Sequence, residues 1–222
     1  MRARSPNTSS AVMQQRKEAR DALDDFPTPP WATRALCEWL LANALDHNAL
    51  GGMVARDPCA NRGYMVAPLA EYFGKVEASD VHDYGAGFLV EDYLFGPPPH
   101  PADITFMNPP FRLAEQFILR ARSTSRQGVA ALVRSAFLEG IGRHERLFSK
   151  DPPSVILQFT ERVVMHKGCV TEKGSSATAY SWLYWDQDGI GKGNPPEFHW
   201  LPQCRKRLER QGDYDVRGAH AD

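Results

Sequence analysis

The chain has 222 residues, of which 26 are basic and 27 acidic, so its formal net charge is −1. A chain of this length buries a full core as one α/β domain and leaves little room for a second domain. The near-neutral charge argues against binding to nucleic acid through overall charge alone, and no stretch approaches the roughly 20 apolar residues that span a membrane.

Hydrophobic patterning predicts strands that alternate with helices. Strands are expected near residues 53–57, 75–80, 103–107, 128–134, 154–160 and 178–185, and helices near residues 31–46, 63–73, 112–122 and 140–149. The alternation favours an α/β fold with a doubly wound, mostly parallel sheet. The last two strands lack an intervening helix, so we expect an antiparallel pair joined by a mobile loop over residues 161–176. Trp182 and Trp185 are expected to pack against this sheet.

Two segments precede the first predicted helix. Residues 1–24 are expected to be flexible, and residues 25–31 read Asp-Phe-Pro-Thr-Pro-Pro-Trp. Proline just before a helix is an ordinary start signal. Thr28 therefore has two interpretations of equal weight, helix entry and ligand contact.

Three segments with acidic side chains follow the first two predicted strands. Residues 57–63 read Asp-Pro-Cys-Ala-Asn-Arg-Gly, and small residues at the carboxyl end of a strand let the backbone approach a ligand. Asp80 ends the second strand, and Asp92 lies in a short Glu-Asp-Tyr-Leu segment beyond it. Each acid alone fits a solvated loop. Their ordered spacing favours a shared site.

The third predicted strand ends in Asn108, Pro109, Pro110 and Phe111. Proline restricts its own φ and the conformation of the preceding residue, so the turn is stiff and its carbonyl groups point in fixed directions. An amide oxygen and a peptide oxygen there can accept both hydrogens of one amine, beside an aromatic ring. A second Asn-Pro-Pro, at residues 194–196, follows a polar stretch and no apolar strand, so we interpret it as a loop.

Charge changes sign at this turn. Residues 21–111 contain 4 basic and 13 acidic side chains, whereas residues 112–150 contain 8 basic and 3 acidic ones. A solvated helix face explains any single arginine. The cluster as a whole lies where a phosphate backbone would have to pass, and its candidate nucleic-acid contacts are Arg112, Arg134, Arg143 and Arg146.

Together, these motifs resemble those of class I S-adenosylmethionine-dependent methyltransferases over roughly residues 25–186. The closest resemblance is to the small amino-methylating DNA adenine methyltransferases of phages and mobile elements, whose first motif runs Asp-Pro-x-x-Gly-x-Gly. Asn61 stands where the first of those glycines is expected. Since asparagine tolerates positive φ better than other non-glycine residues, the turn is expected to survive.

The resemblance implies a Rossmann-like catalytic domain over residues 25–200, a tail over residues 201–222 and S-adenosylmethionine as cofactor. The implied catalytic residues are Asn108, Pro109, Pro110 and Phe111. The implied cofactor-binding residues are Thr28, Asp57, Pro58, Cys59, Ala60, Asn61, Gly63, Asp80, Asp92, Tyr93 and Asn108. The implied substrate is adenine in DNA, with no metal ion required.

Two other functions fit the same motifs. The turn also serves the methylation of other amines, namely those of cytosine, RNA adenine and a protein glutamine, although the glutamine enzymes typically have tyrosine where Phe111 stands. Alternatively, Asn61 could mark a decayed cofactor site in a nucleic-acid-binding subunit. The sequence does not identify an oligomeric state or a recognition site.

The spacing of the cysteines indicates the redox state of the cellular compartment. Cys37, Cys59, Cys169 and Cys204 have neither paired metal-ligand spacing nor a disulfide framework, which favours a reducing compartment. The first 20 residues lack the apolar core of a signal peptide. A cytoplasmic location is therefore expected.

Overall fold

A computed structural model describes residues 23–45, 50–187 and 194–215 of the chain. It contains one eight-stranded sheet in the order β3-β2-β1-β4-β5-β7-β6-β8. Strand β7 runs antiparallel to its neighbours β5 and β6, and the other pairings are parallel. The expected mostly parallel sheet with an antiparallel pair is confirmed. The prediction of flexibility for residues 1–22 lies outside the described residues.

All six predicted strands form, and the structure adds two more at the edges of the sheet. The strands are β1 (Val54–Asp57), β2 (Lys75–Asp80), β3 (Leu89–Val90), β4 (Ala102–Met107), β5 (Ser125–Arg134), β6 (Val155–Phe159), β7 (Tyr180–Asp186) and β8 (Glu197–Leu201). Strand β3 has two residues, too few for a periodic pattern. Strand β8 pairs in parallel with β6. Its Phe198 and Trp200 alternate with polar residues, a strand pattern that the prediction overlooked, and both rings are exposed.

The helices differ more from the prediction. They are α2 (Pro30–Asn43), α4 (Val66–Leu69), α5 (Ala114–Thr124), the 3-10 turn η1 (Ser135–Leu138), α6 (Ile141–Arg143), the π-helical turn η2 (His144–Phe148) that continues α6, and α7 (Arg205–Leu208). The helix predicted over residues 63–73 is wrong in length. Gly63 has a φ of 82°, outside the helical region, and Pro68 lacks the backbone N–H that a longer helix needs.

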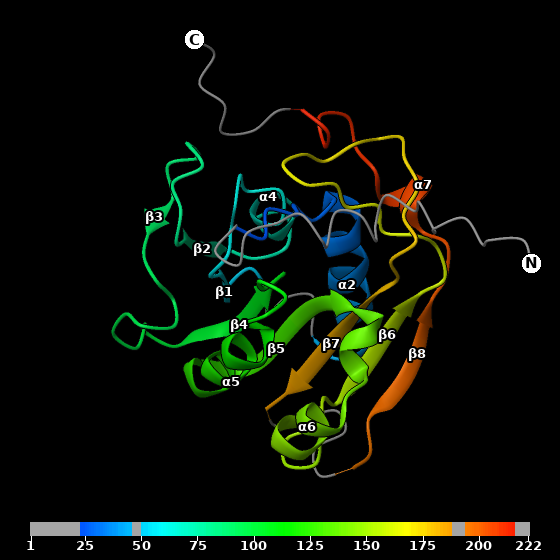
Figure 1. Ribbon diagram of the computed structural model, residues 1–222. Helices are drawn as coiled ribbons and strands as arrows, with labels where there is room; N and C mark the ends of the chain where they lie inside the picture. Colours follow the sequence, from blue (N-terminus) through cyan, green and yellow to red (C-terminus); the bar gives the residue numbers. More distant parts are fainter. Residues whose placement is uncertain (1–22, 46–49, 188–193, 216–222) are drawn as a thin grey trace, which may run out of the picture.

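Helices cover both faces of the sheet (Figure 1). On one face α2 packs through Trp31, Leu36 and Leu40 against alternate residues of β4, β5 and β7. On the other, α5 packs through Phe117 and Ile118. The prediction that the two tryptophans of β7 are packing residues is confirmed, because both are buried and they lie on opposite faces of the sheet.

Residues 161–176 form a loop with neither helix nor strand, as expected, but part of this loop is packed. Val163, Val164 and Met165 are buried. Met165 lies near the turn after β4, where the Asn108 side-chain nitrogen is 3.8 Å from its sulfur. The loop therefore helps to enclose the carboxyl end of the sheet.

A buried ion network joins the start of α2 to the C-terminal part of the described chain. The Arg34 guanidinium, 3% exposed, donates to the Asp213 carboxylate at 2.6 and 2.8 Å and to the Glu71 carboxylate. It also donates to the Leu208 carbonyl at 2.8 Å. These carboxylates raise the pKa of Arg34 despite its burial. Residues 205–213 are thereby fixed to the helix that precedes the sheet.

We expect Asp213→Ala to lower the free energy of unfolding by about 3 kcal/mol, because it leaves a buried guanidinium without one of its carboxylates. Urea denaturation measures the loss. Glu38→Ala, which removes a carboxylate from the exposed Arg207 on the same side of α2, is the control and should cost less than about 1 kcal/mol. Equal losses in the two variants would contradict a structural role for the network.

Candidate active site

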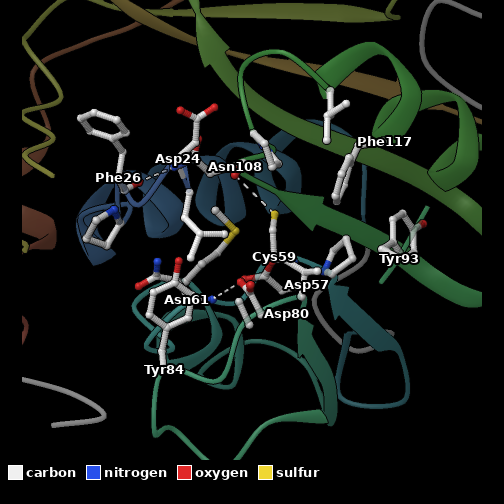
Figure 2. Close-up of a pocket in the computed structure, with 18 of the residues that line it drawn as sticks. Asp24, Phe26, Asp57, Cys59, Asn61, Asp80, Tyr84, Tyr93, Asn108 and Phe117 are labelled. Atoms are coloured by element: carbon white, nitrogen blue, oxygen red, sulfur yellow. Dashed lines mark hydrogen bonds between the residues drawn. The ribbon is translucent and has the colours of Figure 1, made fainter. Parts of the chain in front are cut away.

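A pocket of about 870 Å³, counting the part that opens to solvent, lies at the carboxyl ends of β1, β2 and β4 (Figure 2). These strands are adjacent and parallel, so their ends meet at one edge of the sheet, where doubly wound folds bind ligands.

Most of the residues singled out in the sequence line this pocket. They are Thr28, Asp57, Pro58, Cys59, Ala60, Asn61, Asp80, Asp92, Tyr93, Asn108 and Pro110. Gly63, Pro109 and Phe111 lie next to lining residues in the chain but do not line the pocket themselves.

Two buried carboxylates lie at the floor of the pocket. Asp57 is 1% exposed; its Oδ1 accepts the Cys59 N–H at 3.1 Å, and its Oδ2 is buried and accepts no hydrogen bond within the described chain. Burial, with a smaller contribution from the charge of Asp80, raises the pKa of Asp57 to about 7. Burial also raises the pKa of Asp80, although that carboxylate accepts the N–H groups of Asn61 and His82.

The turn after β1 takes the conformation that its sequence requires. Asn61 has a φ of 51° and is the non-glycine residue with positive φ in the described chain. The expectation that asparagine can replace the family's glycine here is confirmed for the backbone. Gly63 also has a positive φ, of 82°, which favours glycine, and a Cβ added there would require the tip of the Phe88 ring, 2.9 Å away, to shift.

The segment after β3 forms one wall of the pocket. The Asp92 carboxylate accepts the N–H groups of Leu94 and Phe95, which closes a tight turn. Tyr93 is buried, with its ring 5.4 Å from the ring of Phe117 on α5 and its hydroxyl 3.1 Å from that of Thr124. The wall therefore offers an acid and apolar surface side by side.

Residues 23–29, which we call the N-terminal strap, cross the pocket opposite that wall. Thr28 is 3% exposed, and its hydroxyl oxygen is buried without a hydrogen-bond partner among the described residues. The Asp24 carboxylate accepts the Phe111 N–H at 2.8 Å. The Phe26 carbonyl accepts the Asn108 side-chain N–H at 2.7 Å. The strap thus touches both the pocket and the turn after β4.

These contacts orient the Asn-Pro-Pro turn. Because the Asn108 side-chain nitrogen donates to the strap, its amide oxygen is the atom left to accept a hydrogen bond from a ligand. The Asn108 peptide carbonyl is 3.4 Å from the Cys59 sulfur, and the Pro110 carbonyl accepts the Leu113 N–H. Burial raises the pKa of the Cys59 thiol, so it remains a donor.

Phe111 lies behind the turn in a stack of side chains. The Arg134 guanidinium covers its ring at 3.6 Å, and the Phe26 ring lies 5.5 Å away at an angle of 42°. One face of the Phe111 ring is therefore already occupied by a cation, which the sequence did not indicate.

The four arginines expected to contact nucleic acid have different surroundings. Arg112 is exposed, and Arg134 stacks on Phe111. Arg143 donates to the carbonyls of Phe137 and Glu139, and the exposed Arg146 pairs with Glu115 at 2.8 Å. They do not form one uniform basic surface.

Sequence reasoning missed much of the lining. The missed residues are Leu23, Asp24, Phe26, Pro27, Tyr64, Met65, Val81, Tyr84, Leu94, Phe95, Leu113 and Phe117. Leu113 and Phe117 had a detectable signal, since apolar residues four apart on the helix after the turn share a face. Tyr84, in the loop after β2, had none.

The strand order β3-β2-β1-β4-β5-β7-β6, extended here by β8, defines the fold of class I methyltransferases. Solved structures agree. A protein from Vibrio vulnificus described as a modification subunit of a type I restriction enzyme matches 94% of this chain with a TM-score of 0.56 and 14% identity. A protein from Pyrococcus horikoshii described as an RNA methyltransferase matches 77% of this chain and 90% of its own, with a TM-score of 0.54 and 16% identity.

The chain spans about half the length of the Vibrio subunit, since the match covers 53% of that protein. No family model matches the sequence, and no curated protein matches it significantly. At these identities the likeness establishes the fold. It leaves the reaction and the substrate to be argued from the site.

The pocket suits S-adenosylmethionine. The Asp57 carboxylate oxygen and the Thr28 hydroxyl are buried without a partner among the described residues, and the cofactor's ammonium group can donate hydrogen bonds to both. The carboxylates of Asp80 and Asp92, which also line the pocket, can accept hydrogen bonds from hydroxyl and amine groups of the same cofactor. Among the described residues no group of three or more metal-ligating side chains occurs, and no helix is long and apolar enough to cross a membrane.

The raised pKa of Asp57 predicts a pH dependence of stability. An unfolded aspartate has a pKa of about 3.9, so between about pH 4 and pH 7 the folded protein retains a proton that the unfolded chain releases. The contribution of Asp57 to stability therefore falls as pH rises through this range. Asp57→Asn, which cannot titrate, should flatten that decline in urea unfolding measured across it. The exposed Asp83→Asn controls for loss of charge; an unchanged decline in Asp57→Asn would contradict the assignment.

Proposed function

We propose that this protein is an S-adenosylmethionine-dependent methyltransferase that methylates the exocyclic amine of adenine in DNA. The observation that carries the proposal is the hydrogen bond from the Asn108 side-chain nitrogen to the Phe26 carbonyl. It leaves the amide oxygen, on a lining residue of the pocket, as an acceptor for a substrate amine.

The chain's residues need only position the amine. The adenine amine is a weak nucleophile because its lone pair is delocalised into the ring. The Asn108 amide oxygen and the Pro109 carbonyl would accept its two hydrogens and direct the lone pair toward the pocket. The Pro109 carbonyl accepts no hydrogen bond from the described residues, which suits this role. Such orientation supplies several kcal/mol of barrier reduction, and bound S-adenosylmethionine supplies the activated methyl group.

The surroundings of the turn support a nucleobase substrate. The rings of Phe26 and Phe111 lie beside it, and aromatic side chains stack on bases that have left a duplex. Arg134, which stacks on Phe111, and the exposed Arg112, which follows it in the chain, add positive charge beside the turn.

Asn108→Ala should reduce methyl transfer to unmethylated DNA by about 100-fold or more, because it removes an acceptor aimed at the reacting amine. Transfer of tritiated methyl groups measures the loss, and calorimetry should show cofactor affinity within a few fold of the wild type. The chain provides a matched control in its second Asn-Pro-Pro copy, which is exposed: Asn194→Ala should leave transfer unchanged. Retained activity in Asn108→Ala would refute the assignment.

A further inference from the structure

The side chain of Asn61 does more than permit a turn. Its amide nitrogen donates to the Asp25 carboxylate at 2.8 Å, and its amide oxygen accepts the N–H of Arg62 at 2.8 Å. The Arg62 guanidinium also donates to Asp25, at 2.9 and 3.1 Å. A glycine at position 61 would give the same backbone turn without any of the side-chain bonds.

Asp25 belongs to the N-terminal strap, so this cluster connects two walls of the pocket. The Asp25 carbonyl accepts the Gly168 N–H at 2.8 Å, which fixes the strap from the other side. The Arg62 guanidinium lies 4.7 Å from the ring centre of Tyr84, a lining residue of the loop after β2. Figure 2 shows Asn61 and Tyr84 on the same side of the pocket as Asp80.

The cluster is half-buried, which strengthens its hydrogen bonds. The side chain of Asp25 is 15% exposed and that of Arg62 is 23% exposed. Charge-assisted hydrogen bonds of this kind are stronger than neutral ones and are less screened than those on an open surface. Adjacent acids of the strap therefore have separate roles: Asp24 contacts the turn after β4, and Asp25 contacts the turn after β1.

We propose that Asn61 is a positioning residue that, through Asp25, holds the N-terminal strap closed over S-adenosylmethionine. Asn61, which stands where the motif has glycine, then strengthens the cofactor site through an added contact and is not a sign that the site has decayed. The inference concerns cofactor binding alone and does not depend on DNA being the substrate.

A double-mutant cycle on cofactor affinity tests this proposal. Asn61→Gly keeps the positive φ and removes the side chain, and it should weaken S-adenosylmethionine binding about tenfold, as expected for one charge-assisted hydrogen bond. Asp25→Ala removes the same hydrogen bond together with the ion pair to Arg62, so it should weaken binding at least as much. Adding Asn61→Gly to Asp25→Ala should weaken binding little further, because the partner of the Asn61 side chain is already gone. Calorimetry with the full-length protein measures all four affinities.

Hydrogen exchange in the cofactor-free protein supplies a readout independent of affinity. The Phe26 amide, which donates to the Asp24 carbonyl, and the Gly168 amide, which donates to the Asp25 carbonyl, should exchange faster in both single variants, while the urea midpoint of the whole protein stays close to that of the wild type. Wild-type affinity in Asn61→Gly, additive losses in the double variant, or unchanged exchange of these amides would each overturn the proposal. Failure to methylate DNA would count against the proposed substrate, but it would not change the interpretation of these affinities for S-adenosylmethionine.

Discussion

The site depends on the hydrogen bond between the Asn108 side chain and the Phe26 carbonyl. A parallel sheet brings the ends of β1, β2 and β4 to one edge, but it does not determine which atoms of the following turn face a ligand. The proline pair makes the turn stiff, and the contact with Phe26 decides the orientation of the Asn108 amide. The residues that orient this turn therefore come from the strap, more than 80 positions earlier in the chain.

The distribution of charge follows the same geometry. The acidic first half of the chain supplies the floor of the pocket, where Asp57 and Asp80 are buried and the charge of Asp80 adds to burial in raising the pKa of Asp57. A cationic ligand offsets the cost of burying them. The basic stretch that begins after Phe111 supplies Arg134, which lies on the far side of the turn. The turn thus lies between the acidic pocket floor and the guanidinium of Arg134.

The sequence was informative where a single segment determines its own structure. The central strands are continuous apolar runs, and Asn61 has the positive φ that its place in the motif demands. Prediction failed where structure depends on contacts between distant segments. No local pattern shows that Asp24 accepts the Phe111 N–H, that Asp25 meets Asn61, or that the exposed β8 is held by pairing with β6. The helix predicted over residues 63–73 is longer than the helix that forms, because the positive φ of Gly63 and the missing N–H of Pro68 shorten it.

The central claim is that the turn at Asn108 methylates the amine of adenine in DNA. The most direct measurement is to incubate the protein with S-adenosylmethionine and unmethylated genomic DNA, digest the product to nucleosides and identify the modified base by mass spectrometry. The account predicts N6-methyladenosine in its deoxy form, and none with the Asn108→Ala protein. Methylated cytosine, or no methylated base from a protein that binds the cofactor, would contradict it.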